Sequence, residues 1–404
     1  MIAPLSALDA YRGDRASAGV DVFTPVDAEL TQIAELLTRC TQLPRNGASA
    51  RVNAALRAEC ARLAQSVAEA LDIRSPDQIT DRTPAAVAAV LRAAASLLED
   101  TEALRFANAL LFLADRVLGA DAGVIEQGRI LAQRARVARK IGDQKASMTL
   151  YGLVRDMAER EASPELHARA HVGFAVLARA RGNIPLMTEH ARAALEYGVR
   201  SQLPELLAMG HRSMMLASAA VGKLDDAVLH AWGEYSVFRG DPAREVNALL
   251  TVAQAVLDYG EPAIALRAFA VVLRRPLPKR AELPCLGGAA VAAAKVGERR
   301  LVARIVRRID DLTASTGHPF DSLSSRAEAV MALTILRDAT AEVRRQAVLE
   351  EAEAAGFHEI AYRMAHLTPP KKASSPAPLA SVELREVLAG LEEVSSGMEL
   401  QTAF

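Results

Sequence analysis

Hydrophobic residues recur three and four positions apart along most of the chain, in segments of about 15 to 20 residues separated by short polar breaks. Residues 86–97 show the pattern, since Val90, Leu91 and Ala94 fall on one face of a helix. No run alternates apolar and polar residues as a half-buried strand would. The pattern therefore predicts an all-α fold.

Several predicted helices begin with the same signal, a capping residue followed by proline. The side-chain oxygen of the first residue can accept a hydrogen bond from an unpaired backbone N–H, and proline has no N–H to leave unsatisfied. We expect a helix to start at each proline. The signal occurs at Thr24-Pro25, Thr83-Pro84, Ser163-Pro164 and Asp241-Pro242.

A glycine followed by a polar residue recurs at a nearly constant interval in the middle of the chain. The five glycines are Gly142, Gly182, Gly222, Gly260 and Gly297, and they are separated by 40, 40, 38 and 37 residues. Glycine readily adopts the left-handed conformation that closes a helix. The interval predicts helix–turn–helix units stacked side by side, with each glycine closing the first helix of its pair.

Positions counted from these glycines carry mostly small or apolar residues. Seven residues before them lie Ala135, Ala175, Met215, Ala253 and Ala290. Nine residues after them lie Tyr151, Ala191, Ala231, Phe269 and Val306. The positions five and twelve residues after each glycine follow the same trend, with Glu234 as a polar exception. Such agreement predicts close helix packing in one register.

This pattern resembles the tetratricopeptide repeat, in which a small residue, a turn glycine, an alanine and an aromatic or small residue recur at similar offsets. The resemblance implies a right-handed α-solenoid of antiparallel helix pairs. The period of about 37–40 residues is longer than the usual value of about 34. The usual aromatic residue early in the first helix is replaced by His171, His211 or leucine. Longer helices of this kind are similar to sensor regions of bacterial regulators and to peptide-sensing receptors.

The repeat signature suggests a division of the chain into six parts. It covers residues 122–315 well and extends weakly over the segments on either side. Residues after His366 change to a composition rich in Pro, Ser and Lys, which is typical of an extended linker. The predicted parts are a flexible arm (1–24), N-terminal helical pairs (25–121), tetratricopeptide-like repeats (122–315), C-terminal helical pairs (316–366), a Pro-rich linker (367–380) and a short amphipathic helix with a tail (381–404).

Charge and cysteine content narrow the class of protein. The 48 Lys and Arg residues nearly cancel the 49 Asp and Glu residues, which argues against nucleic-acid binding through bulk positive charge. Cys40, Cys60 and Cys285 are far apart and odd in number, so no disulfide framework or metal site is indicated. The chain shows neither a signal peptide nor an apolar run long enough to cross a membrane. We therefore expect a cytoplasmic protein.

The sequence carries no strong catalytic or cofactor motif. It has no Gly-rich phosphate loop, nucleophile elbow or set of zinc ligands, so we expect no cofactor, no metal and no enzymatic activity. His167 and His171 lie one helical turn apart, but no third ligand is identifiable, and ordinary packing is the simpler interpretation. Cys285 has no evident base partner and is interpreted as a buried structural thiol. Trp232 is interpreted as packing in the core or on the convex side.

One set of residues stands out as a candidate binding surface. In tetratricopeptide arrays the first helix of each pair lines the concave surface, so the resemblance implies that side chains at matching positions point into one groove. Such a groove would suit an extended or helical segment with carboxylates, which Arg can bind in a bidentate manner. The alternative is that these arginines solvate a helix face and pair with residues such as Glu126 or Glu165. The candidates are Arg129, Arg136, Arg139, Arg169, Arg179, Arg212, Asn247 and Gln254.

These observations favour a non-enzymatic scaffold that binds a protein or peptide partner through its concave surface. Stacked repeats leave a long curved surface, which is the natural binding asset of such folds. A second hypothesis is a sensor domain that binds a small molecule or peptide and regulates a transcriptional or signalling partner. A helical enzyme of the α/α-toroid type is a weaker third possibility, because no acid–base pair is marked in the sequence.

The segment Val382–Val394 predicts a short amphipathic helix with four glutamates and one arginine. Two roles are open for it. It could cap the apolar face of the last repeat, because terminal repeats need a polar cover. It could instead occupy the basic groove as an internal ligand that a true partner displaces.

Overall fold

The computed structural model describes residues 84–100, 104–118, 123–275, 277, 279–314, 319–368 and 381–396. These residues form sixteen α-helices and no β-strand, which confirms the predicted all-α fold. None of the described helices is both long and apolar enough to cross a membrane. The predicted N-terminal arm, Cys40, Cys60 and most of the Pro-rich linker lie outside the described residues. The chain divides into two units, one ending at Leu206 and the other beginning at Leu207, inside one helix.

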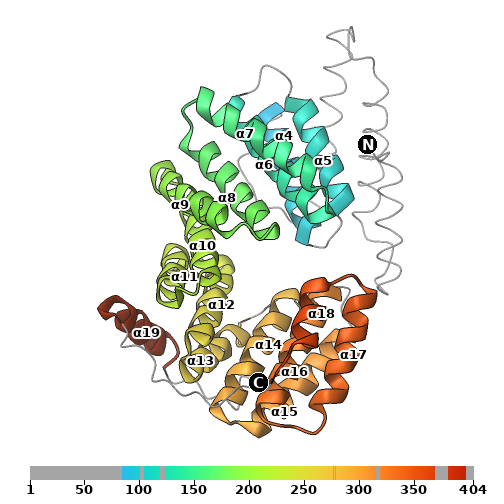
Figure 1. Ribbon diagram of the computed structural model, residues 1–404. Coiled ribbons are helices and arrows are strands. Elements are labelled where there is room, and N and C mark those ends of the chain that lie inside the picture. The colour runs from blue at the N-terminus through green and yellow to red at the C-terminus, as the bar shows by residue number, and fades with distance from the viewer. Residues whose placement is uncertain are drawn as a thin grey trace. The chain divides into compact units, whose positions relative to one another are not determined.

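Unit 1 is built from consecutive helix pairs (Figure 1). Its helices are α4 (Pro84–Asp100), α5 (Leu104–Leu118), α6 (Val124–Ile141), α7 (Gln144–Arg160), α8 (Pro164–Ala180), α9 (Ile184–Ser201) and the start of α10 (Pro204–Ala220). Within each pair the helices pack on one another, and α6 also contacts both α4 and α8. The first helices of successive pairs therefore form one layer.

Unit 2 continues the same plan. Its helices are the rest of α10, α11 (Leu224–Phe238), α12 (Pro242–Tyr259), α13 (Pro262–Leu273), α14 (Lys279–Val296), α15 (Arg299–Thr313), α16 (Pro319–Ile335), α17 (Ala341–Ala354), α18 (His358–Ala365) and α19 (Val382–Val394). The even-numbered helices from α12 to α18 contact one another in order and form the first-helix layer of this unit. Each unit is thus an α-solenoid of helix pairs.

The five turn glycines all adopt the predicted left-handed conformation. Their φ angles are 96° at Gly142, 68° at Gly182, 75° at Gly222, 115° at Gly260 and 94° at Gly297. After each glycine, the backbone N–H of the next residue donates to a carbonyl five residues earlier, as when Asp143 N bonds Ala138 O at 2.9 Å. This bond satisfies a helix-end carbonyl and closes the first helix. The predicted repeat register is therefore confirmed.

Arg337 marks another left-handed turn at the end of a first helix, and the glycine pattern of the sequence did not predict it. It follows Gly297 by 40 residues, ends α16, and has a φ of 54°. Asp338 N donates to Leu333 O at 2.9 Å, the same bond that follows the five glycines. The repeat geometry thus extends past residue 315 without its glycine, which is why the sequence signature weakened there.

The core follows the predicted offsets. Ala135, Ala175, Ala253 and Ala290 are at most 2% exposed, so the first helices approach their neighbours closely through small side chains. Tyr151 packs into the core of unit 1, where Gly173 leaves room for its ring. Phe269 is fully buried in the core of unit 2. Ser163 caps α8 as predicted, because its side chain accepts from Leu166 N at 3.3 Å.

Helix α19 has the predicted bounds but neither of its two predicted positions. It packs against α11 and α13, which are second helices of their pairs, and not on the last pair or on the first-helix layer. Leu384, Val387 and Leu391 join the core of unit 2. Trp232 lies beneath it, and Arg267 binds Glu392 at 2.7 Å. Both the capping and the groove-occupying interpretations are therefore wrong, because the apolar stripe of α19 packs on the second helices α11 and α13.

Candidate functional site

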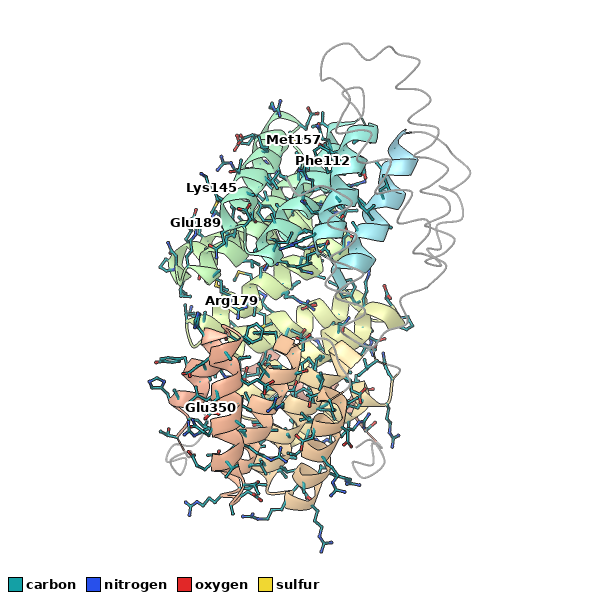
Figure 2. All side chains as sticks on the ribbon, turned by 90° about the vertical axis from the view of Figure 1, so that its right-hand side faces the viewer. Phe112, Lys145, Met157, Arg179, Glu189 and Glu350 are labelled. Atoms are coloured by element: carbon teal, nitrogen blue, oxygen red, sulfur yellow. The ribbon has the colours of Figure 1, made fainter. Side chains whose placement is uncertain are left out.

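The eight predicted binding residues all lie on first helices of their pairs. The way in which charged residues pair on these helices differs between unit 1 and unit 2. Charged residues on second helices, such as Lys145, Glu189 and Glu350, are exposed (Figure 2). On the first helices of unit 1, by contrast, acidic and basic side chains of neighbouring repeats form ion pairs with one another.

Four helices of unit 1 are joined by an alternating ladder of charges. Arg92 on α4 binds Glu126 on α6 at 2.6 Å, and Glu126 also binds Arg129 at 3.1 Å. Arg129 also donates two hydrogen bonds of 2.7 Å to Glu165 on α8. We call this chain, which continues below to α10, the unit 1 ladder.

The unit 1 ladder ends at the start of α10. Glu165 accepts from Arg169 at 2.9 Å, and Arg169 binds Glu205 at 2.6 Å. Burial disfavours the charged form of Glu165, but hydrogen bonds and charges from Arg129 and Arg169 outweigh burial and lower its pKa. Two of the predicted binding residues, Arg129 and Arg169, are thus committed to carboxylates of the protein itself.

Arg136 and Arg212 also pair with buried carboxylates. Arg136 donates twice at 2.9 Å to Glu99 on α4, whose side chain is 3% exposed. In unit 2, Arg212 binds Glu234 on α11 through two hydrogen bonds, one of them 3.0 Å long. This pair explains the polar exception at Glu234, which occupies an otherwise apolar offset. The alternative that these arginines pair with the protein's own acids describes the structure well.

The remaining four predicted residues are less engaged. Arg179 is exposed near the C-terminal end of α8, and Asn247 is exposed in the second turn of α12. Arg139 is partly buried, and its Nε lacks a hydrogen-bond partner among the described residues. Gln254 donates to Asp258 on the same helix at 3.1 Å. The structure does not bring all eight predicted residues into one site within a unit.

A second polar group lies on the first helices of unit 2. We call it the unit 2 cluster, and its members are Gln254 and Asp258 on α12, Lys295 on α14, Glu328 on α16 and Arg363 on α18. Burial raises the pKa of both Glu328 and Asp258. The charge of Arg363 opposes that rise at Glu328, and the charge of Asp258 adds to it. The charges of Lys295 and Arg363 oppose the rise at Asp258. None of these opposite charges forms an ion pair with another in the described structure.

Glu328 is the unusual member of the unit 2 cluster. Its Oε2 is shielded from solvent, and no described residue donates a hydrogen bond to it. Burial raises the pKa of Glu328 to about 7, with the charge of Arg363 opposing that rise. Gly287 on α14 faces this atom so closely that a Cβ there would lie 1.9 Å from Oε2. The absence of a side chain at Gly287 is what gives the carboxylate its place.

The two bases of the cluster are also weakly held. Arg363 donates to the sulfur of Met331 at 3.3 Å, a weak acceptor. Lys295 donates to the carbonyl of Leu257 at 3.4 Å, near the limit for a hydrogen bond. Only Gln254 of this cluster was predicted from the sequence, because the other members are scattered over 105 positions, from Asp258 to Arg363, with no local motif.

Histidine pairs occur at equivalent positions in the two units. In unit 1 the Nδ1 atoms of His171 and His190 are 3.1 Å apart, and in unit 2 those of His211 and His230 are 3.3 Å apart. Burial, together with the charges of His190, His167 and Arg155, lowers the pKa of His171 to about 4. His171 also stacks on Tyr197. These rings connect the two helices of one repeat, so packing accounts for them.

Metal and thiol chemistry gain no support from the described residues. Among those residues, no group of three or more His, Cys, Asp or Glu side chains could hold a metal ion. Cys285 is buried and donates weakly to Phe269 O at 3.6 Å. Burial raises the pKa of the Cys285 thiol, which suppresses its thiolate form. The residue thus has the surroundings of a structural thiol.

No protein-family model and no curated protein sequence matches the chain. Among solved structures, the chain is similar to a signal transduction ATPase with numerous domains that has a tetratricopeptide repeat sensor, from Pyrococcus horikoshii. The identity is 11%, the TM-score is 0.47, and the match covers 84% of this chain and 55% of that chain. The chain therefore spans about half the length of that protein.

The chain is also similar to a second solved structure, the apo form of RapI, with 13% sequence identity and a TM-score of 0.46. That match covers 90% of this chain and 96% of RapI. The helix pairs and turn geometry described above define the class: the chain is an all-α helical-repeat protein. Its repeats are tetratricopeptide-like, with a longer period of 37–40 residues between turns.

Proposed function

We propose that this protein is a non-enzymatic helical-repeat scaffold that binds a protein or peptide partner through its first-helix layer. The observation that carries the proposal is the stacking of first helices, which places polar side chains of successive repeats on one surface of each unit. Stacked repeats commonly use this surface for binding. Arg179, Asn247 and Gln254 are the predicted contact residues that remain available to a partner.

The ion pairs of the unit 1 ladder refine this proposal. A partner with carboxylates would have to compete with Glu165 and Glu205 for Arg129 and Arg169. Breaking a paired, partly buried charge is costly, so these arginines are poor first contacts. Arg179 forms no ion pair with any residue that the structure describes and is therefore the better predicted contact for an acidic segment.

Capture from the native lysate followed by mass spectrometry tests the proposal. The full chain should retain a protein or peptide partner, and Arg179→Glu should weaken that capture without lowering the melting temperature. Arg192→Glu is the matched control, because Arg192 is an exposed arginine on the second helix α9. Equal capture by wild type and Arg179→Glu, or equal loss with Arg192→Glu, would move the contact away from the first helices.

A sensor of a small molecule is the second candidate function. The unit 2 cluster favours it, because an unpartnered carboxylate oxygen and two weakly held bases lie together on the first helices. Buried polar groups are usually satisfied, so such a group calls for an explanation. Thermal stabilisation of the full chain by a metabolite would distinguish a sensor from a scaffold.

A further inference from the structure

The unit 2 cluster has a charge arrangement that the rest of the first-helix layer lacks. Glu328 and Asp258 supply two acids, and Lys295 and Arg363 supply two bases. Glu328 feels the charges of Arg363 and Asp258, and Asp258 those of Lys295 and Arg363, yet none of the opposite charges is paired in the described structure. In the unit 1 ladder, acids and bases at similar places close on each other at 2.6 to 3.1 Å.

The available hydrogen-bonding capacity defines what could bridge these groups. Glu328 Oε2 can accept a bond from a donor such as an ammonium group. Arg363 has a planar guanidinium with five N–H donors, and the thioether of Met331 is its one hydrogen-bond partner among the described residues. A carboxylate suits such a fork, because two parallel bonds can form. The cluster thus offers an acceptor for a cation and donors for an anion side by side.

We propose that the unit 2 cluster binds a small zwitterion, a ligand that carries both an ammonium and a carboxylate group. Glu328 receives the ammonium group, and Arg363 with Lys295 receives the carboxylate. A simple cation would be repelled by the two bases, and a simple anion by the two acids. A free amino acid and an oligopeptide both carry this chemistry. The inference rests on the sensor form of the proposed function.

The space at Gly287 supports this placement of Glu328. A Cβ at position 287 would collide with Oε2 at 1.9 Å, so the carboxylate can hold its present position only while residue 287 is glycine. At Gly288 a Cβ would lie 2.5 Å from the Phe269 ring and 3.0 Å from Gln254 Oε1, so this glycine accommodates the ring first and the amide second. Two consecutive glycines therefore let polar groups of α12 and α16 approach α14 closely.

The experiment measures the melting temperature of the full chain with single probes. The probes are the twenty L-amino acids one at a time, tetra-alanine, spermidine as a cation without carboxylate, and succinate as an anion without ammonium. At about 100 times its Kd, a true ligand raises the melting temperature by about 5 °C. We expect at least one zwitterion to do so and spermidine and succinate to fail. Tetra-alanine and the free amino acids distinguish the two sources of the zwitterion.

Three variants assign the effect to the cluster. Glu328→Gln keeps the side-chain shape and removes the charge, and Gly287→Ala displaces the carboxylate, so each should abolish the ligand-induced shift. Glu351→Gln is the matched control and should keep it, because the Glu351 carboxylate is exposed and binds Arg326 instead. Each variant is compared with its own ligand-free melting temperature, which separates lost binding from lost stability.

Three results would overturn the inference. These are no shift with any zwitterion, an equal shift with spermidine or succinate, and a shift that survives in both Glu328→Gln and Gly287→Ala. A captured partner that depends on Arg179, found together with no zwitterion effect, would leave the scaffold function standing and remove this inference alone. Loss of both would remove the proposed function as well.

Discussion

The charged side chains of the first-helix layer are paired differently in the two units. In unit 1, charges between neighbouring repeats close into the ladder from Arg92 to Glu205, so each carboxylate meets at least one guanidinium. In unit 2, the Oε2 atom of Glu328 is shielded from solvent and accepts no hydrogen bond from a described residue, and Arg363 donates to a thioether. Similar helix pairs therefore carry a continuous series of ion pairs in unit 1 and, in unit 2, a group of acids and bases that are not paired with one another.

The difference teaches where to look for function in a repeat protein. Arginines on the first helices were predicted to form a ligand surface, yet four of them, three in unit 1 and Arg212 in unit 2, bind the protein's own acids. Such pairs hold neighbouring helices in register. Polar groups of the same layer that lack hydrogen-bond partners are better candidates for ligand contacts. An unsatisfied buried polar group contributes no stability to the fold, so its presence calls for another explanation.

The largest expected effect comes from opening the unit 1 ladder. Glu165→Gln should lower the free energy of unfolding by about 3 kcal/mol, because Arg129 and Arg169 both lose a charged partner in a partly buried place. Chemical denaturation near pH 7 measures this. As a control, Glu189→Gln changes an exposed carboxylate on α9 and should cost little. A loss below about 0.5 kcal/mol for Glu165→Gln would show that the ladder is no more than a surface feature.

The same substitution in the unit 2 cluster should have the opposite sign. The folded pKa of Glu328 is about 7, above the value of 4.5 expected in the unfolded chain. The unfolded chain therefore releases this proton first as pH rises, and stability is lost between about pH 4.5 and 7. Glu328→Gln should stabilise the protein by about 2 kcal/mol at pH 8 and have no effect near pH 4. Destabilisation at pH 8 would mean that the carboxylate is paired.

The histidine pair of unit 1 should give a pH dependence of the reverse direction. His171 has a folded pKa of about 4, below its ordinary value of 6.5, so protonation favours the unfolded chain. Stability is complete above pH 6.5 and is lost as pH falls toward 4, by about 2 kcal/mol at pH 5. His171→Asn should flatten this loss in urea titrations at pH 8 and 5. An unchanged pH slope in the variant would assign the acid sensitivity to other groups.

A smaller effect compares the glycine turns with the turn at Arg337, which has no glycine. Arg337 is exposed and has a φ of 54°, which costs an ordinary residue about 1 kcal/mol. Arg337→Gly should therefore raise the free energy of unfolding by up to about 1 kcal/mol. Gly222→Val is the mirror change and should lower it by about 1 kcal/mol or more. If both variants melt like wild type, the left-handed turns do not limit stability.

The fold was predictable because its signals are local. The glycine turns, the N-cap at Ser163 and the bounds of α19 each depend on a few adjacent residues. The turn at Arg337 was missed because another residue can adopt the same conformation when tertiary packing holds it. Helix α19 was misplaced because an amphipathic stripe shows that a helix is covered without showing by what.

The candidate site was only partly predictable for a related reason. An acidic residue recurs in the first turn of successive first helices, at Glu126, Glu165, Glu205, Glu245 and Glu282. That recurrence could have indicated that the arginines were already paired, since partners in the ladder lie 34 to 36 residues apart. The unit 2 cluster has no such signal. Its members share only their position on neighbouring first helices.

The packing of α19 has an optical consequence. Trp232 is the single tryptophan of the chain, and Gly390 of α19 lies against its indole, where a Cβ would be 3.0 Å from the ring. Tryptophan fluorescence of the protein therefore comes from one indole, and α19 packs against it. Detachment of α19 would admit water to that ring and shift its emission to longer wavelengths. The chain thus contains a natural reporter that needs no label and that follows one helix in real time.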